Sequence, residues 1–234
     1  MKSAKKGKLG RPLVSVVLPC RDEEKTIALC IEKAKRVFRE QKIRGEIIIS
    51  DSSSDNSAEI ASEMAGAIVI KHDGKGYGNA YLKVLWQVKG KFVILCDSDN
   101  TYDLLEMPLL LESLKQGYDF VIGSRFKGKM EKGSMRLLHK YIGNPFLNAF
   151  FNLRFGTSFS DTHCGFRGFR KSSLESLKLE SRGMEFALEM VLQSVKAGLK
   201  TAEIPVSYYK RVTPSKLHSF RDGTRHMLFM LRGR

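Results

Sequence analysis

Short runs of aliphatic and β-branched residues alternate with segments of helical spacing through the first half of this 234-residue chain. Polar residues hardly interrupt these runs, which is the pattern of strands buried on both faces. The alternation therefore predicts an α/β fold in which a mainly parallel sheet is flanked by helices. The expected strands are Leu13–Leu18, Glu46–Ser50, Ala67–Ile70, Lys91–Cys96 and Asp119–Ile122, with helices over 24–41, 57–65, 74–88 and 106–115.

The second half of the chain is less regular. Asn144 is expected to cap a helix whose first position is Pro145. Later elements are expected at 146–155 (helix), 184–196 (helix), 201–206 (strand) and 220–231 (basic amphipathic helix). The domain organisation expected from these patterns is a basic tail (1–11), one globular domain (12–217) and a basic C-terminal helix (218–234).

Positive charge is concentrated at the two ends of the chain. The formal net charge is +15, of which residues 1–11 supply +5 and residues 211–234 another +5. Such clusters favour anionic partners, namely phosphates, acidic lipid surfaces or nucleic acid. Solubility alone is an equally simple explanation for the N-terminal cluster.

Several classes of protein are disfavoured. The four cysteines are scattered without a C-x-x-C pair, so neither a zinc site nor a disulfide framework is expected, and a reducing cytoplasm fits. The basic N-terminus lacks the apolar stretch of a signal peptide, and no window approaches 18 uncharged apolar residues. A nucleic-acid-binding protein would place aromatic residues among its cations on an exposed sheet. Here the basic ends flank a crevice lined by carboxylates, so no nucleic-acid partner is expected.

Asp97 and Asp99 directly follow the fourth predicted strand. Two carboxylates so close repel each other unless a cation or hydrogen-bond donors lie between them, and hard oxygen ligands suit Mg²⁺ or Mn²⁺. A turn with local side-chain hydrogen bonds is the alternative for an isolated D-x-D. Polar residues also follow two other predicted strands, at 21–23 and 51–56. Because ligands bind beyond the carboxyl ends of such strands, the position favours the metal site.

Other polar segments are open to two interpretations. Asp51 lies at a strand end, where its carboxylate can accept hydrogen bonds from a nucleobase, whereas Asp55 is expected to cap the next helix. The segment Gly74–Gly78 lacks the ending of a phosphate-binding loop and does not follow the first strand. It fits a flexible helix entry as well as a place beside a nucleotide. His163 and Cys164 are adjacent, so both are expected to pack in the core.

The motifs that carry a family resemblance in the first half are Val17-Leu18-Pro19 with Glu23, Ser50-Asp51-Ser52-Ser53 with Asp55, Gly76 with Gly78-Asn79-Ala80, Asp97-Ser98-Asp99 and Gly123-Ser124-Arg125-Phe126. In this order they resemble the family 2 inverting glycosyltransferases, which have the Rossmann-like GT-A fold. The later motifs are Asp161-Thr162-His163-Cys164-Gly165-Phe166-Arg167, Met184-Glu185-Phe186 and Ser215-Lys216-Leu217. These are similar to the branch of dolichol- and polyprenyl-phosphate mannose or glucose synthases, and the resemblance covers about residues 12–231.

The resemblance implies roles for the matching residues. Those near the nucleotide would be Pro19, Arg21, Glu23 and Asp51, and those holding metal and diphosphate Asp97, Ser98 and Asp99. Donor or acceptor phosphates would meet Arg125, Arg211 and Lys216, and the acceptor phosphate also Arg136 and Ser215. Asp161 and Glu185 would lie near the sugar, and the catalytic set would be Asp97, Asp99, Arg125 and Asp161. One departure is Thr101, which stands where relatives often have a metal-binding Gln.

The resemblance further implies transfer of a hexose, with inversion, from a nucleotide-diphosphate sugar to a polyprenyl or dolichyl monophosphate, assisted by Mg²⁺ or Mn²⁺. GDP-mannose is favoured; UDP-glucose or UDP-GlcNAc is the alternative donor, and a soluble or other lipid the alternative acceptor. A lipid phosphate is already anionic, so its attack needs positioning and charge neutralisation rather than a strong base. Expected partners also include an anionic membrane surface and a separate membrane subunit, with peripheral attachment to the cytoplasmic face of the membrane.

A lipid tail requires a membrane-facing surface, for which the helices at 146–155 and 220–231 are candidates. In the second, Phe220, Leu228 and Leu231, together with Met227, are expected to form one apolar face, with arginines elsewhere. A basic amphipathic helix of this kind suits the membrane interface, where each cation contributes about 1 kcal/mol. Packing of both helices on the core is the alternative.

Overall fold

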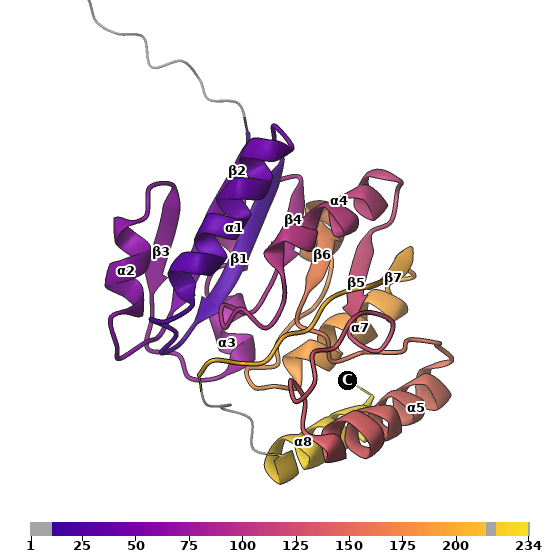
Figure 1. The fold of residues 1–234 in the computed structure, drawn as a ribbon. Helices are drawn as coiled ribbons and strands as arrows, with labels where there is room; N and C mark the ends of the chain where they lie inside the picture. The colour runs from indigo at the N-terminus through magenta and orange to yellow at the C-terminus, as the bar shows by residue number, and fades with distance from the viewer. Residues whose placement is uncertain (1–10, 214–218, 234) are drawn as a thin grey trace, which may run out of the picture.

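The structure, a computed structural model, describes residues 11–213 and 219–233. Within them a seven-stranded sheet has the order β3-β2-β1-β4-β6-β5-β7 and is flanked by helices (Figure 1). The strands are β1 (Val14–Cys20), β2 (Gly45–Asp51), β3 (Ala67–Lys71), β4 (Phe92–Leu95), β5 (Phe120–Ser124), β6 (Arg167–Arg170) and β7 (Thr201–Pro205). The expected α/β architecture with a mainly parallel sheet is confirmed.

The helices follow the strands in alternation through the first half. They are α1 (Ile27–Glu40), α2 (Ser57–Glu63), α3 (Tyr77–Leu82), η1 (Leu85–Gln87), η2 (Leu104–Glu106), α4 (Met107–Lys115), η3 (His139–Gly143), α5 (Asn144–Phe155), α6 (Lys171–Glu175), α7 (Phe186–Lys196) and α8 (Ser219–Arg232).

Four parallel strands determine where a ligand can bind. β1 pairs with both β2 and β4, and β2 pairs with β3, all in parallel register. All residues of β4, and all of β1 except Pro19, are buried because helices cover each side of the sheet, as the mainly apolar runs indicated. Since these strands run in one direction, their carboxyl ends form one edge of the sheet. Cys20 and Asp51 are paired at that edge, and Asp97 follows β4 beside them.

The sequence did not predict strand β6. It lies between β4 and β5 and is antiparallel to both, and its four residues carry only one apolar side chain, Phe169. Arg167 is nevertheless fully buried. Its guanidinium donates to the carbonyls of Cys164 (2.7 Å), Ala187 (2.6 Å) and Thr162 (3.0 Å). Because Arg167 pairs with Leu95 at the end of β4, the preceding segment 161–166 reaches the same edge as Asp97.

Two helix predictions were wrong in detail. The single helix expected over 74–88 is divided into α3 and η1, and α3 begins only after Gly76, whose φ of 114° is incompatible with a helix. Asn144 is not a cap, because the π-helix η3 runs directly into α5 and places Asn144 inside a continuous helical segment. The short helix α6 was not expected.

Helix α8 packs against α5 along the lower edge of the molecule in Figure 1. Met230 is fully buried and Met227 packs on the core, whereas Leu228 and Leu231 are 51% and 58% exposed. The single apolar face expected for this helix is therefore divided between core and solvent, and the side chain of Phe220 lies outside the described residues. Among the helices that the structure describes, none has the length and apolar character needed to cross a bilayer.

Candidate active site

A pocket of about 630 Å³ opens at the carboxyl edge of the parallel strands. Its wall is built from segments far apart in the sequence: the ends of β1 and β4, the chain before α3, the start of α7, the segment after β7, and α8. Eight residues that the sequence had singled out line it together: Pro19, Arg21, Asp97, Ser98, Asp99, Arg125, Glu185 and Arg211. The main constellation expected at this edge is thus assembled in one place.

Asp99 is held from both sides. Its Oδ1 accepts hydrogen bonds from the backbone N–H (3.0 Å) and the hydroxyl (2.6 Å) of Thr101. Its Oδ2 lies 3.0 Å from Nη1 of Arg211. Thr101, which stands where relatives often have Gln, therefore orients the carboxylate of Asp99 toward the pocket.

Asp97, by contrast, has an unsatisfied oxygen. Its buried Oδ1 makes no hydrogen bond to any residue that the structure describes. Gly165 lies so close that a Cβ there would overlap the carboxylate. Burial and the neighbouring charge of Asp99 raise the pKa of Asp97 to about 7.

These two carboxylates fit a hard divalent cation. A buried oxygen without a donor, beside a second negative charge, is stabilised by Mg²⁺ or Mn²⁺. Within residues 11–213 and 219–233 no cluster of three His, Cys, Asp or Glu side chains is suited to a metal ion. Phosphate oxygens and water would therefore complete the coordination shell.

Replacing Asp97 with asparagine is expected to stabilise the metal-free protein at neutral pH. The folded protein keeps the Asp97 proton up to about pH 7, whereas the unfolded chain releases it near 3.8. Wild-type stability therefore falls across that interval as pH rises, and the variant avoids this loss. In thermal melts with EDTA, the advantage of the variant should grow between these two values and then level off. An advantage that does not change with pH would contradict this account.

The segment after β7 crosses the ends of the strands toward the N-terminal half of the chain (Figure 1). There the guanidinium of Arg211 donates to Glu23 and also faces Asp99. The hydroxyl of Thr213 donates to Oε2 of Glu23 at 2.7 Å. Glu23 is buried and does not line the pocket, so it acts on the pocket by positioning Arg211.

Arg125 and Asp161 form a buried ion pair. Nε and Nη2 of Arg125 donate to the two carboxylate oxygens at 2.7 and 2.8 Å, and its backbone N–H donates at 3.1 Å. Asp161 is fully buried behind Arg125 and does not line the pocket. The guanidinium also lies over the ring of Tyr208, 5.2 Å from its centroid. The charge of Arg125 is therefore already balanced, and Asp161 positions it.

The glycine-rich segment at the start of α3 packs closely against the loop formed by residues 181–183. A Cβ at Gly76 or Gly78 would overlap the carbonyl of Arg182 or Ser181. The N–H groups of Gly78 and Asn79 donate to carbonyls of the same loop at 3.1 Å. The missing side chains thus allow the backbone of 181–183 to approach closely. This contact places Lys75, Tyr77 and Arg182 in the pocket wall.

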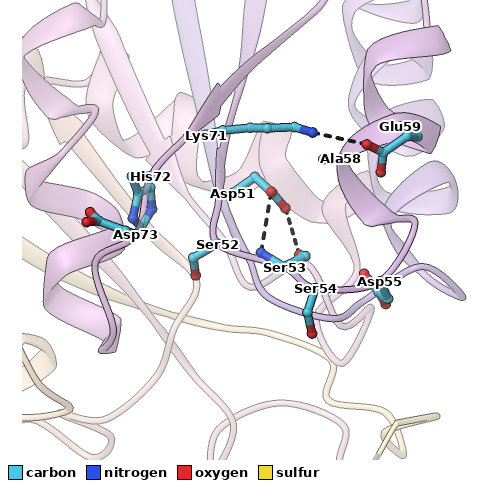
Figure 2. A pocket seen from close by; sticks show the side chains of 10 residues that line it. All are labelled: Asp51, Ser52, Ser53, Ser54, Asp55, Ala58, Glu59, Lys71, His72 and Asp73. Carbon is cyan, nitrogen blue, oxygen red and sulfur yellow. Dashed lines mark hydrogen bonds and ion pairs between the residues drawn. The ribbon is translucent and has the colours of Figure 1, made fainter.

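A second, more open hollow of about 590 Å³ lies beside β2 and β3 and shares Ser52 with the pocket. Figure 2 shows Asp51 there, with its carboxylate accepting from the hydroxyl (2.7 Å) and the N–H (3.4 Å) of Ser53. Lys71 reaches across to Glu59 at 3.0 Å. Asp51 therefore belongs to this neighbouring hollow rather than to the pocket itself.

The sequence predicted Asp55 as the cap of α2, but the N-cap residue is Asn56, whose side chain makes no capping hydrogen bond, and Asp55 lies one residue earlier. Oδ1 of Asp55 accepts a hydrogen bond from the N–H of Ser57 at 3.0 Å. Asp55 also lines the hollow beside β2 and β3.

The remaining candidates are not assembled with these. Arg136 is exposed, before η3, and does not line the pocket. Ser215 and Lys216 lie outside the described residues. Cys164 is buried as expected, but His163 lines the pocket, so its assignment to the core was wrong.

The sequence did not single out the pocket residue Arg225. The sequence shows only that Arg225 belongs to a basic helix, and this property does not distinguish it from Arg232.

The known proteins that this chain resembles are glycosyltransferases. The family model described as glycosyl transferase family 2 matches residues 15–178. The low-salt glycan biosynthesis hexosyltransferase Agl6 of Haloferax volcanii is 44% identical over 221 residues, covering 94% of this chain and 53% of Agl6. The chain thus spans about half the length of that relative. The dolichyl-phosphate hexose transferase of the same organism is 29% identical, covering 90% of this chain and 89% of that protein.

A solved structure shows the same fold. Glucosyl-3-phosphoglycerate synthase from Mycobacterium tuberculosis, in complex with Mn²⁺, uridine diphosphate and glucosyl-3-phosphoglycerate, superposes with a TM-score of 0.74 at 23% identity. The match covers 95% of this chain and 79% of that one. The expected GT-A architecture is confirmed. From the family model and these likenesses, the chain belongs to glycosyl transferase family 2.

Proposed function

We propose that this chain transfers a hexose, with inversion, from a nucleotide-diphosphate sugar to a polyprenyl or dolichyl monophosphate. One observation carries the proposal: the carboxylates of Asp97 and Asp99 share a pocket with several cations from other elements. These cations are Arg21, Lys75, Arg182, Arg211 and Arg225. Such a pocket suits a metal-bound diphosphate and a second phosphate group. The name of the dolichyl-phosphate hexose transferase supports the lipid acceptor.

Asp97 and Asp99 would hold the metal, Mg²⁺ or Mn²⁺. A bound divalent cation would neutralise charge on the departing diphosphate. Arg211, beside Asp99, would contact the same diphosphate through its remaining N–H groups. Ser98 donates its hydroxyl to the carbonyl of Pro19 at 2.6 Å, which ties the carboxylate segment to the end of β1.

The nucleoside would extend from Pro19 and Arg21 into the hollow of Figure 2, where Asp51 lies. The carboxylate of Asp51 would accept hydrogen bonds from the base. Guanine offers a carboxylate both its ring N–H and its amino group, while uracil offers one ring N–H. We therefore favour GDP-mannose over UDP-glucose or UDP-GlcNAc as the donor.

The acceptor phosphate needs no strong base to attack the anomeric carbon, because it is ionised at neutral pH. The protein's task is to hold the phosphate in line with the bond that breaks and to exclude water. Arg125, fixed by Asp161 and by Tyr208, presents a rigid edge to the pocket for this purpose. Glu185, also in the wall, would face the hydroxyl groups of the sugar.

The test is a donor panel with a polyprenyl phosphate, run with and without EDTA. GDP-mannose, UDP-glucose and UDP-GlcNAc are compared, and 3-phosphoglycerate serves as a soluble acceptor. We expect transfer to the lipid phosphate only, lost in EDTA and restored by Mg²⁺ or Mn²⁺. Transfer to 3-phosphoglycerate alone, or turnover that EDTA leaves unchanged, would overturn the proposal.

A membrane surface would be met through η3, α5 and α8. The exposed apolar side chains there are Leu137, Leu138, Tyr141, Ile142, Phe146, Leu153, Leu228 and Leu231. The stretch 132–160 contains four cations and no acid, which suits the anionic cytoplasmic face of a membrane. Such an exposed apolar area is unusual for a protein that remains in water.

Serine at both Leu228 and Leu231 is expected to weaken flotation with anionic liposomes while leaving nucleotide binding unchanged. Both side chains are more than half exposed, so their loss should not disturb the core. Serine at the exposed Leu109, on α4, is the matched control. Equal flotation of wild type and the double variant would show that α8 does not contact the membrane.

A further inference from the structure

Helix α8 contributes one cation to the pocket, Arg225. The other lining residues come from segments that end at Arg211, so α8 forms a separate part of the wall. In Figure 1 this helix lies beside α5, below the sheet. A single helix thus borders both the pocket and the apolar surface of η3 and α5.

The orientation of α8 is fixed by its buried residues. His226 is 6% exposed, and its Nδ1 lies 3.1 Å from Nε2 of His163, which itself lines the pocket. Met230 is fully buried one turn further along. Near the end of the helix, Nζ of Lys196 donates to the carbonyl of Gly233 at 2.5 Å. These contacts fix the helix against the rest of the protein, and Arg225, adjacent to His226, is therefore held at the pocket.

Arg225 differs from two other arginines of the pocket, Arg125 and Arg211, in its ion-pair partners. Arg125 is neutralised by Asp161, and Arg211 is shared between Glu23 and Asp99. The side chain of Arg225 makes no hydrogen bond or ion pair with any residue in the described part of the chain. Its guanidinium can therefore offer two parallel N–H donors to a phosphate, the geometry in which arginine binds anions most strongly.

The helix also provides an exit for a hydrocarbon chain. Leu228 and Leu231 follow Arg225 at intervals of three residues, which places each beside the previous one on the helix surface. Both leucines are more than half exposed. A phosphate held by Arg225 could keep its apolar tail along these leucines and toward the membrane. A soluble nucleotide donor has no use for such a path.

We infer that Arg225 binds the phosphate of the lipid acceptor and that α8 is the acceptor wall of the pocket. The inference rests on the proposed function and adds to it the residue that receives the acceptor. It also divides the cations by task, with Arg211 on the donor side beside Asp99 and Arg225 on the acceptor side.

The test compares Arg225→Ala, Arg225→Lys and the matched control Arg232→Ala, an exposed cation on the same helix outside the pocket lining. Steady-state kinetics vary a polyprenyl phosphate at saturating donor and then the donor at saturating acceptor. We expect Arg225→Ala to raise the acceptor KM about 10- to 100-fold with the donor KM unchanged. Arg225→Lys should recover part of the loss, and Arg232→Ala should behave as wild type.

Two controls make the outcome decisive. Melting temperatures should be equal among the variants because Arg225 is exposed, and calorimetric binding of the nucleoside diphosphate with Mn²⁺ should be unaltered. An unchanged acceptor KM in Arg225→Ala, an equal rise in Arg232→Ala, or weaker nucleoside diphosphate binding would overturn the inference while the proposed function stands. A wild-type protein that transfers no sugar to a lipid phosphate would overturn both.

Discussion

Replacing Asp99 with asparagine is expected to lower kcat/KM for sugar transfer by about 1,000-fold, which is the scale of losing a major electrostatic contact in a transition state. Asparagine has nearly the same shape, and its amide oxygen can still accept from Thr101. The charge that faces Arg211 and would hold the proposed metal is lost, however. Initial rates with donor and polyprenyl phosphate measure the effect, and calorimetry with Mn²⁺ alone should show weakened metal binding.

The matched control is Asp103→Asn, four residues further along. Asp103 pairs with Lys33 at 3.0 Å and does not line the pocket, so the same chemical change should leave the rate within about threefold of wild type. If Asp99→Asn also stayed within that range, Asp99 would not be a metal ligand and the pocket would need another account.

Removing the carboxylate of Asp161 is expected to destabilise the fold by about 3–5 kcal/mol, because Asp161→Ala leaves the guanidinium of Arg125 buried without its counter-charge. Asp161 is fully buried and Arg125 is 8% exposed, so water cannot solvate the guanidinium of Arg125 well enough to replace the lost carboxylate. Urea unfolding at constant pH gives the change in free energy. Activity should fall as well, since Arg125 would no longer be held at the pocket.

The double variant Arg125→Met with Asp161→Leu separates charge from packing. Apolar replacement of a whole buried ion pair is often close to neutral for stability. We therefore expect the double variant to recover most of the stability that Asp161→Ala loses, while remaining inactive. A loss below about 1 kcal/mol in Asp161→Ala would mean that the pair is more solvated than its burial indicates.

The sheet was largely predictable because its strands are marked by composition. β4 is an unbroken apolar run and β1 is interrupted by a polar residue only at Ser15, and burial on both faces requires such runs in a parallel sheet. β6 escaped prediction because its buried Arg167 is satisfied by three backbone carbonyls contributed by distant segments. Because tertiary contacts alone satisfy this buried charge, the local sequence does not indicate a buried strand.

The candidate site likewise contains residues that the sequence could predict and residues whose roles depend on tertiary contacts. Asp97 and Asp99 could be placed together because both follow one strand, and strand ends share an edge. The roles of Asp161 and Glu23 as positioning residues could not be inferred, since each depends on an arginine brought to it by another element. Arg225 was hidden for the same reason: only the docking of α8, through His226, distinguishes it from other cations of that helix.

Gly165 places a constraint on how this sequence can diverge. Every single-nucleotide substitution that changes a glycine codon to another amino acid adds a Cβ, and any Cβ here would overlap the carboxylate of Asp97. No conservative replacement is open at this codon, although the backbone itself is not strained there. In a gene copy released from selection, one change at position 165 would therefore disrupt the proposed metal site while both aspartates remain intact.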